Sequence, residues 1–218
     1  MAHTRSTLKA AATAALICLA AGSARAQDVC RIAVLGDSIA AGLGLDPADA
    51  LPAVLERELQ AAGYACTVID AGVSGDTTAG GLARLDWMLG DRPTHVVVEL
   101  GGNDVLRAIP PEATEANLSA IVERLRAEHI EVLLAGMLAP PNLGPDYADA
   151  FAAMFPRIAD RYGVALYPFV LDGVAAEREL NQPDGIHPNA TGVALIVERM
   201  LPTVRAWLDA TGAKPPPS

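Results

Sequence analysis

The stretch VVVEL, Val96–Leu100, decides the fold class of this chain. Its apolar side chains do not alternate with polar ones, which is typical of a central strand of a parallel sheet, buried on both faces. Short β-rich runs of this kind are expected to be the strands, namely Arg31–Leu35, Cys66–Asp70, His95–Leu100, Val132–Met137 and Val164–Tyr167.

Helical patterns separate these strands, because the apolar side chains between them recur three and four residues apart. The expected helices lie around Leu51–Leu59 and Leu118–Leu125 and over Thr77–Leu89, Asp146–Tyr162 and Ala190–Leu208. Alternating strands and helices predict a parallel sheet with helices on both faces. We therefore expect an α/β fold, a three-layer α/β/α sandwich. For its five parallel strands we expect the flavodoxin-like order 2-1-3-4-5, one of the common orders of such sheets.

The amino terminus has the composition of a secretory leader. A basic head, an apolar run and a small-x-small site at Ala24–Ala26 are the three parts of a signal peptide. We expect residues 1–26 to be removed by cleavage after Ala26, residues 27–210 to form one domain, and residues 211–218, which end in KPPPS, to be a disordered tail. Such a leader predicts a periplasmic or secreted protein.

Acidic side chains outnumber basic ones in this chain by 26 to 16, which gives a formal net charge of −10 at pH 7. The charged side chains of the leader are all basic, so its removal makes the chain more acidic still. An acidic surface repels nucleic acid and anionic lipid, and neither is an expected partner. No later segment has the roughly 18 uninterrupted apolar residues of a transmembrane span, so stable membrane insertion is not expected. We expect the protein to be a monomer.

Two cysteines, Cys30 and Cys66, remain once the leader takes Cys18 with it. An oxidising compartment permits a disulfide between them, and two buried free thiols are the alternative. Cys30 precedes the first strand and Cys66 begins the second, and in the order 2-1-3-4-5 these strands are neighbours about 4.8 Å apart. The topology favours a disulfide at the amino ends of the strands, opposite the ligand site.

The carboxyl ends of the strands are expected to carry the ligand site, as in other open parallel sheets. Glycines and short polar residues gather in the loops at this edge, which contain GDS at Gly36–Ser38, SGD at Ser74–Asp76, GGND at Gly101–Asp104 and DGIH at Asp184–His187. The sequence thus places chemically active side chains from four loops at one edge of the sheet.

Ser38 follows the first strand and a Gly–Asp turn, where its hydroxyl can project into solvent. A serine hydroxyl is a weak nucleophile unless a base takes its proton. Only His187 lies in a loop at this edge, since the other histidines lie in the leader, at the start of a buried strand and at a helix end. Asp184 can accept the Nδ1 hydrogen of His187 and leave Nε2 free as the base, and Asn189 is expected to cap the helix that follows.

Three hydrogen-bond donors are expected to face one point at this edge. Asn103 offers its side-chain NH₂, Gly75 offers a backbone N–H that a ligand can approach because there is no Cβ, and Ser38 offers its own N–H. The candidate site is therefore a triad of Ser38, His187 and Asp184 with an oxyanion hole made by Ser38, Gly75 and Asn103, without a metal or a cofactor.

These four motifs, in this order and at these strand ends, resemble the four blocks of the SGNH hydrolases, the GDSL-type esterase superfamily. The resemblance spans nearly all of the chain after the leader. It implies that Ser38 is the nucleophile, His187 the base and Asp184 the residue that orients the base. It also implies that Ser38, Gly75 and Asn103 form the oxyanion hole.

Two further segments, GLARL at Gly81–Leu85 and ELGGND at Glu99–Asp104, resemble the periplasmic branch of arylesterases, acyl-CoA thioesterases and lysophospholipases. The departures from the family pattern are small. Ile39 stands where the GDSL block has leucine, and an apolar side chain of the same size should leave Ser38 in place. Asp70 stands where relatives often have asparagine, which affects local hydrogen bonding and not the triad.

The expected function is hydrolysis of small acyl esters, with thioesters and lysophospholipids as further candidates. Val105–Ile109 and Met137–Leu143 supply apolar side chains near the site, and the resemblance implies that they line the acyl pocket. A carbohydrate O-acetyl esterase is the alternative. It is less favoured because such an enzyme would present aromatic side chains to the sugar, and only 4% of the residues are aromatic. A metal-dependent phosphoesterase is disfavoured because its metal site needs several converging histidines, and only His187 is well placed. A binding module without catalytic activity is disfavoured because it would not require a base, an orienting residue and oxyanion donors together.

Overall fold

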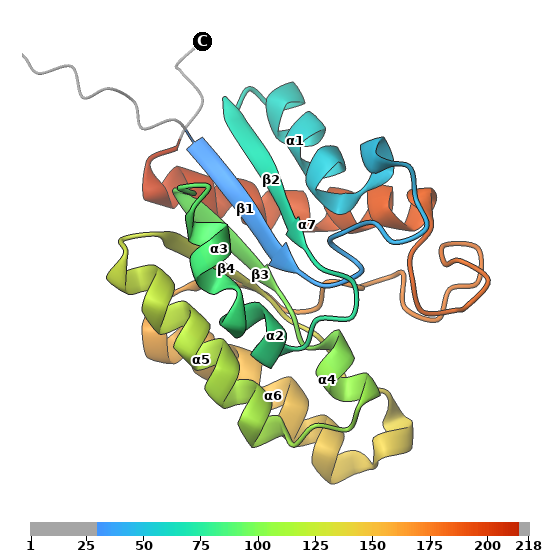
Figure 1. The fold of residues 1–218 in the computed structure, drawn as a ribbon. Helices are drawn as coiled ribbons and strands as arrows, with labels where there is room; N and C mark the ends of the chain where they lie inside the picture. Colours follow the sequence, from blue (N-terminus) through green and yellow to red (C-terminus); the bar gives the residue numbers. More distant parts are fainter. Residues whose placement is uncertain (1–29, 214–218) are drawn as a thin grey trace, which may run out of the picture.

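The computed structural model of the protein describes residues 30–213, and at its centre lies a sheet of five parallel strands in the order β2-β1-β3-β4-β5 (Figure 1). The strands are β1 (Cys30–Gly36), β2 (Cys66–Gly72), β3 (His95–Glu99), β4 (Glu131–Ala135) and β5 (Ala165–Tyr167). The predicted fold class and strand order are confirmed, and each strand differs from its predicted bounds by at most two residues at either end.

Helices cover both faces of this sheet and make the predicted three layers (Figure 1). One face carries α1 (Leu51–Ala61) and α7 (Ala190–Thr211), which pack against each other. The other face carries α2 (Thr78–Ala83), α3 (Leu85–Leu89), α5 (Pro111–Ala127) and α6 (Pro145–Tyr162). The loops carry the short helices η1 (Pro47–Asp49), α4 (Gly102–Leu106) and η2 (Pro141–Leu143).

The core lies on both sides of β3, as the lack of alternation in VVVEL predicts. Val96, Val97 and Val98 have no exposed surface. The helices contribute fully buried side chains from both layers, such as Phe151 on α6 and Ile196 on α7. A strand held between two apolar layers is rigid, so the loops at its carboxyl end start from fixed points.

The predicted single helix over Thr77–Leu89 is wrong, because this segment forms two helices, α2 and α3, that meet at Arg84. Arg84 has φ −103° and ψ 9°, which depart from helical values. Gly80 and Gly81 are poor helix formers and weaken the first of the two helices. At the break, the Arg84 side chain donates a hydrogen bond to Gly36 O at the carboxyl end of β1, at 3.0 Å.

The last helix, α7, continues through Thr211 and ends at Gly212, so it passes the predicted domain boundary at residue 210. Residues 214–218 of the predicted tail lie outside the described residues, as does the predicted signal peptide at residues 1–26. Across residues 30–213, none of the helices is both long and apolar enough to cross a membrane.

A disulfide joins Cys30 and Cys66, whose Cα atoms are 4.5 Å apart. The two residues are register partners at the amino ends of β1 and β2. The predicted bond is confirmed. It lies at the edge of the sheet opposite the loops that follow Gly36 and Gly72.

His95 begins β3 at this amino-terminal edge and is 6% exposed. Its Nδ1 lies 2.8 Å from Thr94 Oγ1 and its Nε2 lies 2.9 Å from Thr211 Oγ1. Its ring meets the Trp207 ring edge to face, with 5.1 Å between the centroids. Burial lowers the pKa of His95 from 6.5 to about 4, so the imidazole is neutral in the folded protein at neutral pH.

We expect the folded protein to lose stability as the pH falls from 6.5 to about 4, because the unfolded chain then binds a proton at His95 that the folded protein does not. The loss from this one group is about 3 kcal/mol, at 1.36 kcal/mol per unit of pKa difference. Denaturant unfolding at pH 7 and pH 4 measures it in the wild type and in His95→Gln. The variant should lose about 3 kcal/mol less than the wild type over this range, and equal losses would contradict the role of His95.

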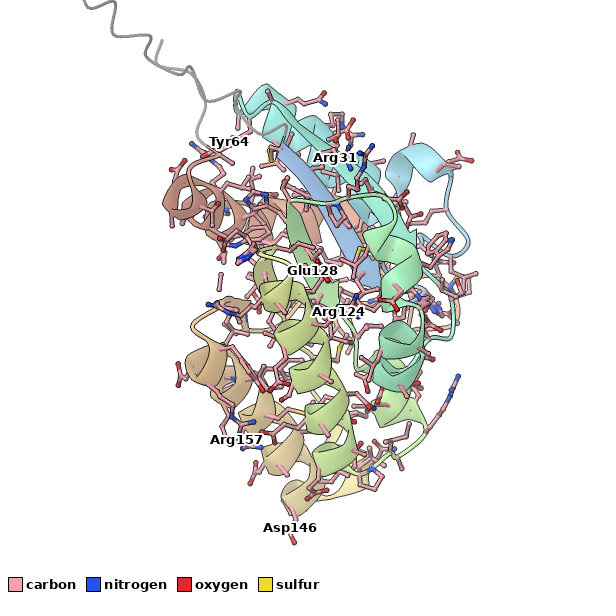
Figure 2. The ribbon with its side chains drawn as sticks, turned by 60° about the vertical axis from the view of Figure 1, so that its left-hand side comes forward. Arg31, Tyr64, Arg124, Glu128, Asp146 and Arg157 are labelled. Atoms are coloured by element: carbon pink, nitrogen blue, oxygen red, sulfur yellow. A yellow bond between two sulfur atoms is a disulfide. The ribbon has the colours of Figure 1, made fainter. Side chains whose placement is uncertain are left out.

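Ion pairs on the surface link the helices of one layer. Arg157 on the outer side of α6 lies 2.6 Å from Glu115 of α5 (Figure 2). Arg124 and Glu128 lie together at the carboxyl end of α5 (Figure 2), and Arg124 also lies 3.0 Å from Asp86 of α3. Each exposed pair contributes about 1 kcal/mol or less, so the packing of apolar side chains determines how these helices lie on the sheet.

Candidate active site

Ser38 lies in the turn that follows β1, and its neighbour Asp37 holds this turn. Asp37 Oδ1 accepts a hydrogen bond from the Ile39 N–H at 3.0 Å, and Asp37 O accepts one from the Ala41 N–H at 3.0 Å. Ser38 itself is 9% exposed. A short turn on the end of a buried strand gives the serine hydroxyl a defined place at the carboxyl edge of the sheet.

His187 and Asp184 lie together in the loop before α7. Asp184 Oδ1 accepts from the N–H groups of Ile186 and His187 at 2.9 and 3.0 Å, and Asp184 Oδ2 lies 2.7 Å from His187 Nδ1. The side chain of Asn189 accepts from the Gly192 N–H at 3.0 Å and caps α7, as predicted. The loop DGIHPN therefore fixes the imidazole ring by local hydrogen bonds.

The ring of His187 joins this loop to Ser38, because its Nε2 lies 2.9 Å from Ser38 Oγ. An ionised carboxylate can only accept, so Nδ1 carries the hydrogen that bonds to Asp184 and Nε2 has the free lone pair. The Ser38 hydroxyl therefore donates to His187. The structure brings together the three side chains of the predicted triad, although Ser38 and His187 are 149 residues apart in the chain.

The hydrogen bond from His187, with those from the backbone, lowers the pKa of Asp184 to about 2. The carboxylate therefore keeps its negative charge at neutral pH, and its exposure to solvent also favours the charged form. A lasting charge beside Nδ1 fixes the tautomer of His187 and favours the positive charge that the ring gains when Nε2 takes up a proton.

Gln182 ties the loop of His187 to the turn of Ser38, and this contact was not predicted from the sequence. Its Nε2 donates to Leu43 O at 2.7 Å and to Pro188 O at 3.0 Å. The Leu43 N–H donates in turn to Ser38 O at 3.0 Å. One amide therefore links the serine and histidine segments.

Two of the predicted oxyanion donors are backbone N–H groups. Gly75 has φ 87°, which a residue with a Cβ adopts only under strain, and a Cβ there would meet only Arg107 Nη2, 3.9 Å away. In the part of the chain that the structure describes, the N–H groups of Ser38 and Gly75 donate to no protein acceptor. Both groups are free to bind a ligand.

The third predicted donor, Asn103, lies in the first turn of α4 after Gly101, which has φ 123°. Asn103 Nδ2 donates one hydrogen to Asp37 Oδ2 at 3.0 Å, and its second hydrogen has no partner among residues 30–213. Arg107, which follows α4, donates from Nη2 to Gly75 O at 2.8 Å. The α4 segment thus contacts the serine turn through Asp37 and the glycine loop through Arg107.

The buried carboxylate of Asp104 anchors α4. Asp104 Oδ2 accepts from the Thr78 N–H at 2.8 Å, and Oδ1 accepts from Thr78 Oγ1 at 2.6 Å and from Thr114 Oγ1 at 3.2 Å. These bonds connect α4 to the first turns of α2 and α5. The aspartate of GGND therefore holds the helix that carries the Asn103 amide.

Arg84 joins the first two motifs. Its Nη2 donates to Gly36 O at 3.0 Å and its Nε donates to Asp76 Oδ2 at 2.5 Å, while the Val73 N–H also donates to Gly36 O at 3.0 Å. The end of β1 and the loop that contains Gly75 are held together by these bonds. The role of Arg84 was not predicted, although it lies in GLARL, a segment that the sequence singled out.

The carboxyl group of Glu99 lies behind the serine turn and is almost wholly inaccessible, with 1% of the residue exposed. Its Oε2 accepts from the Asp37 N–H at 3.4 Å, and its Oε1 has no partner among the described residues. Burial, with a smaller effect of the charge of Asp37, raises the pKa of Glu99 well above its ordinary value. Burial therefore favours the neutral form of Glu99, which adds no charge beside Asp37.

Fold and site together define a class of protein. A parallel sheet that presents a hydrogen-bonded chain of serine, histidine and aspartate at its carboxyl edge, with free backbone donors beside it, is an arrangement found in serine hydrolases that cleave acyl bonds. No group of three or more His, Cys, Asp or Glu side chains within residues 30–213 is placed to hold a metal ion.

Comparison with known proteins gives the family. Residues 34–195 match the GDSL-like lipase/acylhydrolase family, and the chain belongs to this family. It is 43% identical over 176 residues to Esterase TesA of Pseudomonas aeruginosa, a match that covers 80% of this chain and 88% of that protein. It is 38% identical over 177 residues to Thioesterase 1/protease 1/lysophospholipase L1 of Escherichia coli K12, covering 81% of this chain and 84% of that protein.

The solved structures agree with this assignment. The psychrotrophic esterase EstA from Pseudoalteromonas sp., solved as inhibited by monoethylphosphonate, is similar to this chain with a TM-score of 0.78 and 34% sequence identity, over 82% of this chain and 98% of that one. The predicted resemblance to GDSL-type esterases is confirmed, and the protein is an enzyme that hydrolyses ester bonds.

Proposed function

We propose that this protein is a serine esterase that hydrolyses acyl esters through a covalent acyl-enzyme on Ser38. The proposal rests on the hydrogen-bonded chain from Asp184 through His187 to Ser38, with the free N–H groups of Ser38 and Gly75 beside it. This arrangement supplies a nucleophile, a base, a residue that orients the base, and donors for an oxyanion.

In the first half of the reaction, His187 Nε2 takes the proton from Ser38 Oγ while Oγ attacks the carbonyl carbon of the ester. The carbonyl oxygen becomes negatively charged, and the donors of Ser38, Gly75 and Asn103 stabilise it. His187 then gives its proton to the leaving oxygen or sulfur as the bond from the acyl carbon to that atom breaks. The acyl group remains on Ser38, while Asp184 stays ionised and holds the ring.

In the second half, water takes the place of the departed alcohol or thiol. His187 Nε2 takes a proton from the water while its oxygen attacks the acyl carbon, and the same donors stabilise the second oxyanion. The proton returns to Ser38 Oγ as the carboxylic acid leaves. Each cycle consumes one ester and one water and needs no cofactor.

An apolar rim around the site favours acyl substrates. Large apolar side chains that are 41–62% exposed gather in the loops at the carboxyl edge of the sheet, namely Leu43, Val73, Leu106, Leu138 and Ile186. The segments expected to line the acyl pocket, Val105–Ile109 and Met137–Leu143, each contribute one of them. Exposed apolar surface of this kind suits an alkyl chain better than a sugar.

A panel of substrates tests the proposal. It comprises p-nitrophenyl esters of graded chain length, an acyl-CoA, a lysophospholipid and an acetylated sugar; the thioester and the lysolipid are included because the Escherichia coli relative is named for both activities. We expect hydrolysis of the p-nitrophenyl acyl esters, faster than that of the acetylated sugar. Activity confined to the acetylated sugar would favour a carbohydrate O-acetyl esterase. Loss of activity in EDTA that a divalent metal restores would contradict the mechanism.

The Asn103→Ala variant should lose about 10²–10³-fold in kcat with little change in KM, because one oxyanion donor is removed and it acts in the transition state. Steady-state kinetics with a p-nitrophenyl ester measure the loss. Asn117→Ala is a matched control, since the Asn117 amide donates to Thr78 Oγ1 at 3.1 Å and belongs to none of the proposed catalytic groups. A kcat of Asn103→Ala within about tenfold of the wild type would contradict the role of this amide.

We also propose that the protein acts in the periplasm or outside the cell. The composition of residues 1–26 supports this location, as does the disulfide between Cys30 and Cys66, because such bonds persist in oxidising compartments. Cell fractionation with intact-mass analysis tests it. We expect exported protein that begins at Gln27, and active protein that stays in the cytoplasm with residues 1–26 attached would contradict the proposal.

A further inference from the structure

We propose that Asp37 is a positioning residue that aims the side-chain amide of Asn103 at the oxyanion. This inference rests on the proposed function, in which Asn103 is one of three oxyanion donors. Asp37 does not touch the reacting atoms in this account. It acts through the amide that does.

The contacts of Asp37 divide between its two carboxylate oxygens. Oδ1 accepts from the Ile39 N–H at 3.0 Å and shapes the turn that presents Ser38. Oδ2 accepts from Asn103 Nδ2 at 3.0 Å, across 66 residues of sequence. One carboxylate thus sets both the serine turn and the orientation of the asparagine amide.

The hydrogen bond to Oδ2 determines how the Asn103 amide is oriented. An amide group has two N–H bonds in one plane, and anchoring one of them fixes the direction of the other. The anchored hydrogen points to Asp37, and the second hydrogen has no partner among residues 30–213. A donor held in place before the reaction needs no reorganisation when the negative charge develops.

Burial makes both of these bonds necessary. Asp37 is 2% exposed, and burial raises its pKa, while the hydrogen bonds from Ile39 and Asn103 lower it. A buried carboxylate that loses one of its donors is left with an uncompensated charge. The place is also closely packed, since a Cβ on Gly102 would lie 3.1 Å from Asp37 Oδ2.

Two substitutions remove the contact with Asn103 in different ways. In Asp37→Asn, an amide NH₂ replaces one carboxylate oxygen, so a donor faces either Asn103 or the Ile39 N–H. In Asp37→Ser, the hydroxyl can still accept from the Ile39 N–H as in a serine turn, but it has no second oxygen for Asn103. We expect either variant to lose about 10- to 100-fold in kcat on a p-nitrophenyl ester, with KM changed by less than about twofold.

A double-mutant cycle with Asn103→Ala separates this role from a structural one. The cycle uses Asp37→Ser, which keeps an acceptor for the Ile39 N–H. If Asp37 acts through Asn103, Asp37→Ser should change kcat by less than about twofold once the amide is gone. Equal losses in the two backgrounds would overturn the inference. A negligible loss in Asn103→Ala itself would instead contradict the proposed oxyanion hole, so the two failures are distinguishable.

Asp70→Asn is the matched control. Asp70 Oδ1 accepts from the Gly72 N–H at 2.8 Å, the same contact over two residues that Asp37 makes with Ile39, but Asp70 is exposed and contacts no proposed catalytic group. We expect its kcat to stay within about twofold of the wild type. A loss as large as that of Asp37→Asn would show that the effect is general to these turns, and would overturn the inference.

A measurement on the free protein tests the contact without catalysis. In protein labelled with ¹⁵N-asparagine, one Nδ2 hydrogen of Asn103 should exchange with solvent at least about tenfold more slowly than those of the exposed Asn142. The protection should disappear in Asp37→Ser, while the buried Asn181 amide, which donates to Val174 O at 2.7 Å, keeps its own. Exchange of both Asn103 hydrogens as fast as those of Asn142 in the wild type would overturn the inference, whether or not the variants fold.

Discussion

We expect the Ser38→Ala variant to lose on the order of 10⁴–10⁶-fold in kcat for a p-nitrophenyl ester while it keeps its fold. The Ser38 hydroxyl is the only part removed, and it bonds to His187 Nε2 at 2.9 Å. Removal of one oxygen atom leaves no large cavity, so thermal unfolding should stay close to that of the wild type. Steady-state kinetics and circular dichroism of the purified variant measure both quantities.

The companion variant His187→Ala should be impaired to a similar degree, because the hydroxyl is a weak nucleophile without its base. The two residues act as one unit, so the double variant Ser38→Ala/His187→Ala should lose little beyond either single variant. Activity of folded Ser38→Ala within about tenfold of the wild type would rule out the covalent mechanism at this serine.

The second large effect is expected at the other edge of the sheet. Replacing Cys30 and Cys66 together by serine should lower the free energy of unfolding by about 3–4 kcal/mol, because the bond closes a long loop in the unfolded chain. The two residues are 36 positions apart in sequence. A loss of this size corresponds to about 6–16 °C in melting temperature for a domain of this length.

The same variant should keep its kcat at low temperature, since the bond lies at the amino ends of β1 and β2 and the proposed catalytic groups lie at the carboxyl ends. Wild type treated with a thiol reductant should melt near the double variant, and the double variant should not respond to the reductant. A melting temperature unchanged by either treatment would contradict a stabilising role for this disulfide.

Most of the sheet could be predicted from the sequence because its signals are local. Three valines buried on both faces mark β3, and the alternation of strands and helices indicates a parallel sheet, whose order is the flavodoxin-like one. The helix break at Arg84 could not be predicted in this way. Arg84 donates there to Gly36 O, 48 residues away, and no local pattern in the sequence indicates this contact.

In the candidate site, too, the contacts within one loop could be predicted and the contacts between distant segments could not. Asp184 and His187 are three residues apart, so their hydrogen bond could be predicted from one loop. The contacts that hold the loops in place relative to one another could not be predicted. They join distant segments through backbone oxygens and, at Gln182, through a side chain that belongs to no recognised motif. Gln182 reaches Leu43 across 139 residues, and Asp37 reaches Asn103 across 66.

Labelling with a fluorophosphonate tests most directly whether Ser38 is the activated nucleophile. Attack by Ser38 Oγ on phosphorus expels fluoride and leaves a stable phosphonate ester that intact-mass analysis and peptide mapping can locate. We predict one adduct per chain, on the peptide that contains Ser38, formed rapidly by the wild type and far more slowly by His187→Ala. An active wild-type enzyme that gains no adduct, or gains one on a residue other than Ser38, would contradict the account.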